Sequence, residues 1–520
     1  MSASEQDMTF PDLPRLHLWN MPVHTAGHPG FHMPGHAAAR FFTGNYAQAL
    51  ISIDTTELSS SDDLHDPSGP ALLAMRESSR LYGSGETLFV TTGSTTGIQV
   101  MLASIVTPDT FLLIPRTVHM SVLHALALLD CQYAFISYPR SEDSSQLENT
   151  RNPYLYPQLS AQVLEDALNY FPQTTDILLV SPDYYGQCAD LPALAIIEHK
   201  HGSRLLVDEA HGSHFSFAKN LFPPDAMTSG ADICVQSLHK TLPALTMASQ
   251  IHISADAIRG KRVSVVHVWD MLRLFETSSP SFVIAASSEF ALAWMAKYGS
   301  AALEERIQDI QEFTARISPL LGAQLTENAK YGMSDPLHLV LSCDPGLVSA
   351  PDLTAALEKR GIYIEFADLI RMVLIISPWQ NKADFDVLFD ALSDSVNEML
   401  AVHTAGHSVG IRDAGDGKQP ESGDTADLDR LWGAILTTVP GRGISLRSAV
   451  FGGYGKETID ISKAEDRICA SAIVPYPPGV AVLWPGERIS QEHITVLERL
   501  VKLRFTVRGV HMGKIDVLQE

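Results

Sequence analysis

Residues 85–255 alternate short β-rich runs with helical stretches, and this rhythm limits the fold more than any other feature of the chain. The β-rich runs are TFLLIP, YAFISY, DILLVS, SRLLVDEA and ADICVQS, and stretches such as TTGIQVMLASIV and LSAQVLEDALNYF lie between them. Parallel strands need long crossovers, which are usually helices that cover the sheet. The alternation therefore predicts an α/β domain, with a mostly parallel sheet and helices on both faces.

The remainder of the 520 residues divides around this domain, because one ordinary core does not extend over so long a chain. Residues 1–60 are rich in Pro, Gly and His and have no sustained period, which favours an arm that lies on something larger. The polar insert 141–158 is predicted to be a surface excursion. The predicted boundaries are 1–60 for the N-terminal arm, 61–318 for the large domain, 319–407 for a small α/β domain, 408–427 for a polar linker and 428–520 for a C-terminal domain.

Composition narrows the classes of function. The chain is 45% apolar and 19% charged, as expected of a globular protein. Its net charge of −23 argues against a nucleic-acid partner, because binding phosphates requires a basic face. The same charge fits a cationic substrate, although acidity that serves solubility is the simpler explanation.

Cysteine usage and hydropathy indicate the compartment. The five cysteines are far apart and never form a C-x-x-C pair, so neither a disulfide framework nor a zinc ribbon is predicted. The N-terminus lacks a basic stretch and an apolar segment, and no run reaches the roughly 18 apolar residues of a membrane span. We therefore expect a cytoplasmic protein without a membrane partner.

Four histidines recur at every fourth position near the N-terminus, and on a helix they would form a metal-binding stripe. They are His24, His28, His32 and His36. Pro29, Gly30, Pro34 and Gly35 interrupt the same stretch and make a helix improbable. An ordered arm is the better interpretation, and no metal is predicted.

The segment DEAHGSH at 208–214 allows two interpretations. In a DEAH helicase the acidic pair works with a phosphate cradle of the form G-x-x-x-x-G-K-[ST]. No such cradle occurs in this sequence, and RGKR at 259–262 and DGKQ at 416–419 lack both the spacing and the hydroxyl. The nucleotide interpretation is therefore poor.

The alternative depends on where the residues fall in the predicted sheet. Asp208 ends the run SRLLV, and about thirty residues later ADICVQ leads into SLHK, which ends at Lys240. The two side chains are expected at the tips of adjacent strands, where open α/β sheets bind ligands. A lysine that forms a Schiff base and an aspartate at a pyridinium nitrogen are the pair that pyridoxal phosphate chemistry requires. Taken alone, Lys240 would be expected at the surface. The apolar strand pattern that precedes it favours a desolvated amine with a lowered pKa instead.

A phosphate anchor is predicted at TTGSTTGIQVMLAS, residues 91–104. This Gly- and hydroxyl-rich turn opens a helix, whose free N–H groups and positive dipole end favour an anion. Gly93, Ser94 and Thr95 would line it. The signal is weak alone, because Ser and Thr begin most helices.

Several motifs in order resemble the fold-type I pyridoxal phosphate enzymes known as the ornithine/lysine/arginine decarboxylases, especially their shorter bacterial branch, which lacks an N-terminal receiver-like domain. The resemblance covers most of the chain. The motifs that carry it are FHMPGH (31–36), DTTELSSSDDLHDPSGP (54–70), TGSTTG, RTVHMS (116–121), SPDYYGQCADL (181–191), VDEAHGSHFSF (207–217), QSLHKTLPALTMASQIHI (236–253), TSSPSF (277–282) and PYPPGVAVLWPGE (475–487).

The resemblance implies roles for matching positions. Lys240 would hold the cofactor as a Schiff base, Asp208 would pair with the ring nitrogen, and His119 would stack on the ring. His211 would lie beside the cofactor, near the substrate carboxylate or the Schiff base. The groups expected to hold phosphate oxygens are Ser94, Thr95, Ser237 and His239. Glu487 is a candidate contact for a substrate's distal cation, and Asp63 is a second candidate contact for the substrate.

The resemblance also implies a homodimer or larger assembly, in which the TSSPSF segment and the DDLH arm lie near the interface of shared sites. It implies a place in amino-acid metabolism and polyamine synthesis. Three positions depart from the family pattern: Ala37 and Met120 stand where basic residues are common, and Thr92 replaces an Asn. These departures put the usual substrate in doubt.

The leading hypothesis is a decarboxylase of an L-amino acid, most simply a basic one such as arginine, lysine or ornithine. A second hypothesis keeps the cofactor but changes the reaction to transamination, aldol cleavage or decarboxylation of an acidic or modified amino acid. A third is a cofactor-binding regulator without catalysis, which the intact Lys240, Asp208 and His119 argue against.

Overall fold

The computed structural model describes most of the chain between residues 30 and 519. The described ranges are 30–36, 49, 52–58, 61–137, 159–321, 333–343, 348–368, 370–404, 435, 439–476, 479–503 and 505–519. Most of the predicted arm, the insert 141–158, the linker 408–427 and Ala37 lie outside them. The five domain boundaries stay a prediction, and α13 (Ser300–Leu321) runs through the one predicted at 318.

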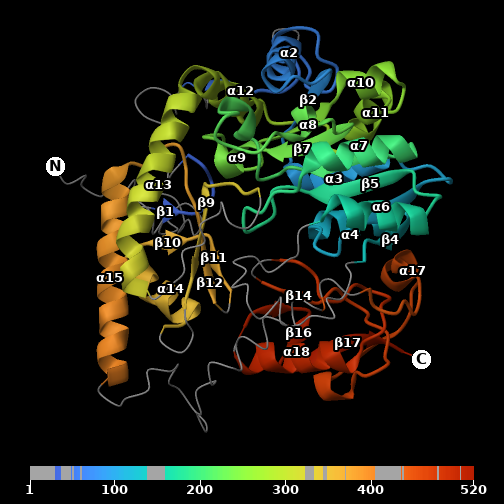
Figure 1. The fold of residues 1–520 in the computed structure, drawn as a ribbon. Helices are drawn as coiled ribbons and strands as arrows, with labels where there is room; N and C mark the ends of the chain where they lie inside the picture. Colours follow the sequence, from blue (N-terminus) through green and yellow to red (C-terminus); the bar gives the residue numbers. More distant parts are fainter. Residues whose placement is uncertain are drawn as a thin grey trace, which may run out of the picture.

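A seven-stranded sheet forms the centre of the molecule (Figure 1). Its strands, in spatial order, are β2 (Glu86–Val90), β8 (Ser249–Ile253), β7 (Ile233–Ser237), β6 (Arg204–Asp208), β5 (Asp176–Val180), β3 (Phe111–Ile114) and β4 (Gln132–Phe135). The pairs from β7 to β4 are parallel, whereas β8 runs antiparallel to both β2 and β7. The predicted α/β class with a mostly parallel sheet is confirmed.

Both faces of this sheet are buried, and alternate strand residues serve different cores. Leu178 packs in one cluster with α3, α4 and α11, while Ile177 and Leu179 pack in another with α6 and α7. This alternation follows from the two-residue period of a strand, and it explains why the strands read as continuous apolar runs. The helices around the sheet are α2 (Pro70–Tyr82), α3 (Ser94–Ala103), α4 (Met120–Leu129), α6 (Ala161–Tyr170), α7 (Leu191–His201), α8 (Ala226–Ser229), α9 (Leu238–Thr241), α10 (Ala255–Arg259) and α11 (Val265–Phe275).

A second unit follows, in which two long helices pack beside a small antiparallel sheet (Figure 1). The sheet has the order β11 (Phe366–Ala367), β12 (Arg371–Ile375), β9 (His338–Ser342). The helices are α12 (Phe282–Trp294), which continues through a π-turn at Met295–Gly299 into α13, and α14 (Ala350–Glu358) and α15 (Lys382–Thr404). Near the N-terminus, β1 (Gly30–Phe31) pairs in parallel with β10 (Tyr363–Ile364), so this piece of the arm lies on the second unit.

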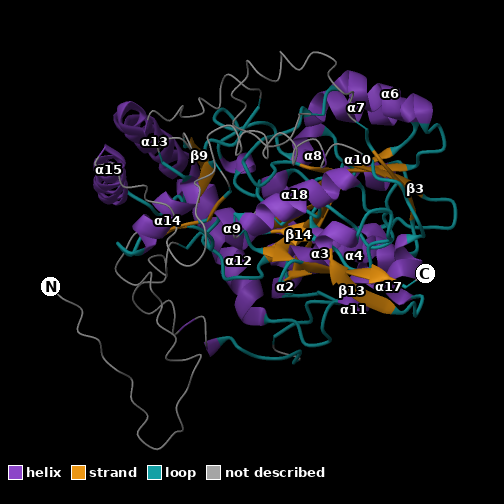
Figure 2. Ribbon diagram, turned by 90° about the horizontal axis from the view of Figure 1, so that it is seen from below, coloured by secondary structure: helices purple, strands orange, loops and turns teal. Residues whose placement is uncertain are grey.

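The C-terminal part packs α18 (Gln491–Lys502) near a three-stranded sheet, which lies below the central sheet in Figure 1 and is seen from another side in Figure 2. Its elements are α17 (Leu446–Phe451), β13 (Lys456–Asp460), β14 (Val474–Pro475), β15 (Val507–Arg508), β16 (Val510–His511) and β17 (Lys514–Leu518). Tyr185, from the turn after β5, is buried in the same core as Val340 of β9 and Val482 of this part. The three units therefore share packed surfaces.

A seam joins the turn at 183–188 to the turn at 333–338. Gln187 and Ser334 form an antiparallel bridge, and the amide of Asp335 donates to the carbonyl of Gly186 at 2.7 Å. Gly186 has a φ of +80°, and a Cβ there would lie 2.5 Å from the Cβ of His338, so this close approach requires glycine. The seam fixes the second sheet against the carboxyl edge of the central one.

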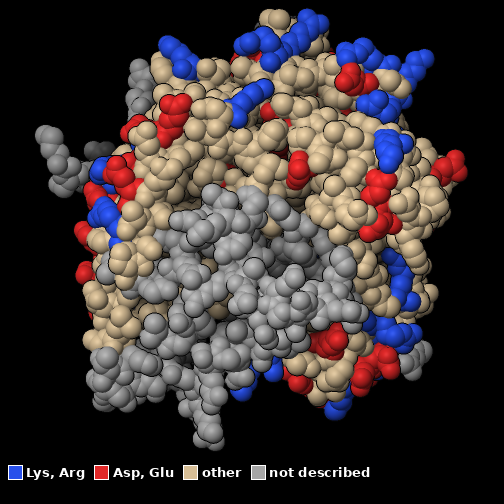
Figure 3. Space-filling model, in the orientation of Figure 1, with Lys and Arg blue, Asp and Glu red and all other residues tan. Residues whose placement is uncertain are grey.

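Charge is mixed on the face seen in Figure 3: Lys and Arg gather over α2 and α10, and both signs occur lower down. Within the described residues, no helix is both long enough and apolar enough to cross a bilayer. All five cysteines are buried and free.

Candidate active site

Asp208 and Lys240 lie at the same edge of the sheet, as their positions in the sequence predict. Asp208 is the last residue of β6, which pairs in parallel with β7. Lys240 belongs to the short helix α9, which begins directly after β7 ends at Ser237. Parallel strands end at one edge, so both side chains reach the space beyond it.

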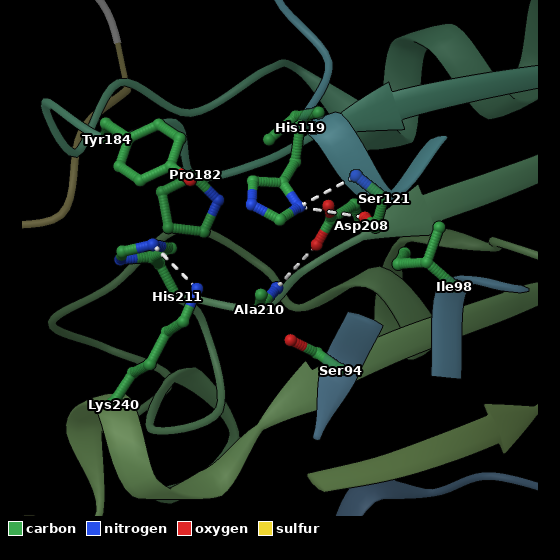
Figure 4. Close-up of a pocket in the computed structure, with 11 residues that line it drawn as sticks. Ser94, Ile98, His119, Ser121, Pro182, Tyr184, Asp208, Ala210, His211 and Lys240 are labelled. Atoms are coloured by element: carbon green, nitrogen blue, oxygen red, sulfur yellow. Dashed lines mark hydrogen bonds between the residues drawn. The ribbon is translucent and has the colours of Figure 1, made fainter. Parts of the chain in front are cut away.

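A pocket lies at this edge, and Figure 4 shows its side chains arranged around a common space. Five of the residues predicted to form the site line it together. The lining residues are Ser94, Ile98, His119, Ser121, Val180, Pro182, Tyr184, Asp208, Ala210, His211 and Lys240. Polar groups that converge in a buried space of this kind mark a ligand site.

The buried positions of the acid and the amine alter both of their pKa values. Burial raises the pKa of Asp208, while Lys240 and a hydrogen bond from the Ala210 amide oppose the rise. Burial also lowers the pKa of Lys240, and the negative charges of Asp208 and Glu365 oppose this decrease. A desolvated lysine loses its proton more readily, as a nucleophilic amine must.

The turn before α3 supplies a site for an anion. Gly93 precedes the helix with a φ of 90°, and among the described residues no side chain caps the first-turn N–H groups. Ser94 lines the pocket, whereas Thr95 is exposed and is not among the lining residues. Uncapped N–H groups at a helix start attract negative charge.

Ser237 gives an independent indication of a missing partner. Its side chain is wholly buried, and its Oγ has no hydrogen-bond partner in the described part of the chain. Buried hydroxyls are nearly always paired, so an unpaired one at the end of β7, three residues before Lys240, needs an explanation. Together with the free N–H groups of α3, Ser237 fits a bound phosphate. His239 is also predicted to hold the phosphate, and its Nδ1 lies 3.1 Å from the carbonyl oxygen of Ala248.

His119 caps α4 and lies over the pocket (Figure 4). Its Nδ1 accepts from the amide of Ser121 at 3.2 Å and lies 2.8 Å from the Ser121 hydroxyl. Burial, followed by the charge of Lys240, lowers the pKa of His119 to about 4. The ring is therefore neutral near pH 7, and its fixed plane suits stacking on a flat ligand.

His211 makes the closest polar contact to the lysine: its Nε2 lies 3.1 Å from Nζ of Lys240. Its other ring nitrogen lies 3.1 Å from Nε2 of His338, which comes from β9 of the second sheet. The sequence reasoning missed His338, as well as Asp335, which binds it. A histidine inside the apolar run LHLVLS was the available signal, because a polar group in a buried strand needs a partner.

A short N-terminal segment touches the lysine helix. The amide of Gly35 donates to the carbonyl of His239 at 2.8 Å, and Ser377 donates to the carbonyl of Gly35 at 2.6 Å. A Cβ at Gly35 would lie 2.7 Å from the carbonyl oxygen of Leu242. The glycine of FHMPGH therefore permits a close backbone approach beside Lys240.

Glu487 and Asp63, the candidate substrate contacts, are not among the residues that line the pocket. Both Glu487 oxygens bind the guanidinium of Arg116, and one also accepts from the amide of Trp484. Asp63 accepts from the amides of His65 and Asp66. Their contact with a substrate stays a prediction.

Two of the departures from the family pattern lie in the described structure. The hydroxyl of Thr92 lies 3.3 Å from the buried carboxylate of Glu276, which also binds Thr91 and His65. Met120 begins α4, directly after His119. Neither side chain lines the pocket. Thr92 and Met120 each lie within two positions of a lining residue in the chain.

Comparisons with known proteins give matches over most of the chain. The family model described as Orn/Lys/Arg decarboxylase, major domain, matches residues 15–331, and the C-terminal domain of the same family matches residues 451–507. The Bacillus subtilis (strain 168) protein YaaO is 32% identical over 92% of this chain and 92% of its own. An arginine decarboxylase of the same organism is 25% identical over 94% of each chain. The structure of lysine decarboxylase LdcF from Francisella novicida has a TM-score of 0.70 at 18% identity and covers 98% of this chain and 79% of its own.

Proposed function

The chain belongs to the ornithine/lysine/arginine decarboxylase family, and from this premise we propose that a basic L-amino acid loses its α-carboxyl group in the pocket around Lys240. The enzyme is a pyridoxal phosphate-dependent decarboxylase of fold type I, and its products are CO2 and an amine. The observation that carries the assignment to this pocket is the placement of Asp208 and Lys240 at one sheet edge.

The residues that would hold the cofactor surround the pocket. Lys240 would bind its aldehyde carbon, and Asp208 would face its ring nitrogen. The N-terminus of α3 and the unpaired hydroxyl of Ser237 would hold its phosphate. When bound, the cofactor supplies an electron sink for the bond that breaks as CO2 leaves.

The side chains of this chain would then perform three tasks. The carboxylate of Asp208 would keep a positive charge on the ring nitrogen of the bound cofactor, since a buried anion stabilises a cation beside it. His119 would lie against the ring and exclude water from one face. His211 lies within hydrogen-bond distance of Nζ of Lys240 and can carry a proton to or from it. Held geometry and preorganised charge provide most of the rate enhancement.

A basic substrate is supported by several relatives, which are named arginine or lysine decarboxylases. The net charge of −23 is consistent with a cationic substrate. We propose arginine, lysine or ornithine, with the pathway context of polyamine synthesis. The departures at Thr92 and Met120 make the choice among them a matter for direct assay.

We further propose that two or more copies assemble and that the enzyme works in the cytoplasm. The segment 277–279 of TSSPSF is exposed between α11 and α12, next to the exposed Leu274. Five buried, free cysteines support a reducing compartment.

The direct test is Lys240→Ala, assayed on protein reconstituted with pyridoxal phosphate. We expect loss of the visible absorbance of the lysine-bound cofactor and loss of amine production from each of a panel of L-amino acids, with the amine detected by mass and CO2 and keto acid measured separately. Lys219→Ala, which removes an exposed lysine, is the matched control and should change neither. Full activity of Lys240→Ala would refute the proposal.

A further inference from the structure

A line of hydrogen-bonded side chains leads from Lys240 into the second sheet. Beyond His211, whose Nδ1 lies 3.1 Å from Nε2 of His338, the Nδ1 of His338 lies 2.7 Å from Oδ2 of Asp335. The side chains of His338 and Asp335 are wholly buried, and His211 is 5% exposed. Neither His338 nor Asp335 lines the pocket, so their contact with the site passes through His211.

The chemistry of the groups fixes where the protons lie. An ionised carboxylate only accepts, so Nδ1 of His338 carries a hydrogen that it donates to Asp335. A neutral His338 then has a bare Nε2, which accepts from Nδ1–H of His211. The Nε2 of His211 is consequently bare as well, and it faces the amine of Lys240.

Asp335 is held as an anion by further donors. Its Oδ1 accepts from Nε2–H of His214 at 3.1 Å and from the amide of Leu337 at 2.9 Å. Burial alone would raise the pKa of Asp335, but the electrostatic and hydrogen-bond interactions with His214 and His338 outweigh it and lower the pKa. A fixed negative charge therefore stands at the far end of the line.

We propose that His211, His338 and Asp335 form a proton relay that removes the proton of Lys240 and stores it on His338. In the step, an N–H bond of the Lys240 ammonium breaks and its proton joins Nε2 of His211, while the proton of His211 Nδ1 passes to Nε2 of His338. The result is a neutral amine at Lys240 and an imidazolium at His338 beside the Asp335 carboxylate. Protons and charge balance, and no other reactant is needed.

The relay rests on the proposed function, in which Lys240 must bond to an aldehyde, because only an uncharged amine carries the electron pair for that bond. A buried ammonium is costly unless an anion compensates it. An imidazolium 2.7 Å from a carboxylate has such a partner, joined to it by a charge-assisted hydrogen bond. The relay thus moves the charge to a compensated place without passing it through water.

Other titratable groups face the relay from the elements packed around it. His119 and His239 act on His211, Asp208 and Glu365 act on Lys240, and Asp183 lies near His338. Tyr184 packs edge-on against His211, with ring centroids 5.2 Å apart. All of these stay in place in the variants below, so a shift between variants and wild type reports the relay itself.

The test measures how fast the full-length protein, stripped of cofactor, captures added pyridoxal phosphate as a function of pH, by the rise of visible absorbance. His338→Gln can still bond to His211 but cannot carry a proton. We expect its capture rate to match that of wild type at high pH and its midpoint to move to higher pH by about one unit, which makes capture about tenfold slower below the midpoint. Asp335→Asn, which removes the charge that stabilises the imidazolium, should shift the midpoint the same way.

His252→Gln is the matched control, because His252 is equally buried and hydrogen-bonded, to Thr87 and Gln236, and in the part of the chain that the structure describes no hydrogen bond joins it to Lys240. Its midpoint should stay at the wild-type value, and thermal unfolding identifies variants that fold. Wild-type midpoints in His338→Gln and Asp335→Asn would overturn the relay alone. A wild-type protein that captures no cofactor at any pH would instead overturn the proposed function.

Discussion

Asp208 and Glu209 are adjacent in the chain, but only Asp208 lines the pocket. Asp208 ends β6 and faces the pocket, whereas Glu209 points into the core. The carboxylate of Glu209 accepts from the amide of Ala226 at 2.8 Å and from the amide nitrogen of Gln236 at 2.7 Å. Burial, followed by the charge of Asp225, raises the pKa of Glu209 well above its usual range.

These environments predict different results for two similar changes. Asp208→Asn removes the charge that faces the cofactor, and we expect the decarboxylation rate to fall roughly a hundredfold or more, as when a preorganised electrostatic contact is lost. Glu209→Gln keeps the shape of a side chain that does not line the pocket, so most of the activity should remain. Steady-state kinetics with a saturating substrate measures both. Equal losses in the two variants would contradict the distinction.

At the same scale, the sequence could predict the residues that end strands but not those that reach the site from elsewhere. Asp208 and Lys240 follow apolar runs, and the edge they share could be inferred from the order of those runs. His338 lies 127 residues from His211, and their contact depends on how the second sheet packs. No local pattern encodes that packing, so the relay could be found only in the structure.

At the scale of elements, the ion pair of Arg116 and Glu487 joins the loop after β3 to the C-terminal part. Arg116 is fully buried, and its guanidinium also donates to the carbonyl of Val482 and lies 4.6 Å from the ring of Phe135. A buried pair of this kind becomes costly when one partner is removed, because the remaining charge has no compensation.

We therefore expect Glu487→Gln to lower the free energy of unfolding by about 3–5 kcal/mol, measured by denaturant titration. The double variant Arg116→Met with Glu487→Met should recover much of this loss, since no charge is left buried. The same experiment tests the predicted substrate role of Glu487. An increase in KM with unchanged stability would favour that role over the structural one.

Strand direction is what the sequence pattern could not give at this scale. The runs singled out at 85–255 correspond to β3, β4, β5, β6 and β7, and their parallel arrangement follows from the helices between them. The run QIHI forms β8, which follows α9 after a short turn and runs antiparallel to β7. A β-rich run looks the same in either direction, so only the length of the connection carries this information.

At the scale of the whole molecule, exposed apolar side chains on α2, α11 and α12 fit the predicted assembly of two copies. Leu73, Leu274 and Phe290 are 65%, 69% and 42% exposed, and their helices lie along one side of the molecule in Figure 1. Exposed apolar patches of soluble proteins often mark interfaces. The exposed segment 277–279 connects α11 to α12.

We expect Leu274→Asp to reduce the mass in solution to that of a single chain, because a charge would be buried in the interface. Ile196→Asp is the matched control: Ile196 is 72% exposed on α7, away from these helices, and its change should leave the assembly intact. Light scattering coupled to gel filtration measures both. An unchanged mass for Leu274→Asp would place the interface elsewhere.

The seam between the turns at 183–188 and 333–338 has a consequence for how substitutions in this chain should be interpreted. A survey of variants would normally class residues 333–338 as remote, since they lead into β9 of a different sheet and none of them is among the residues that line the pocket. Because the seam holds the second sheet against the edge where the lysine lies, changes there should behave genetically like changes in the catalytic centre.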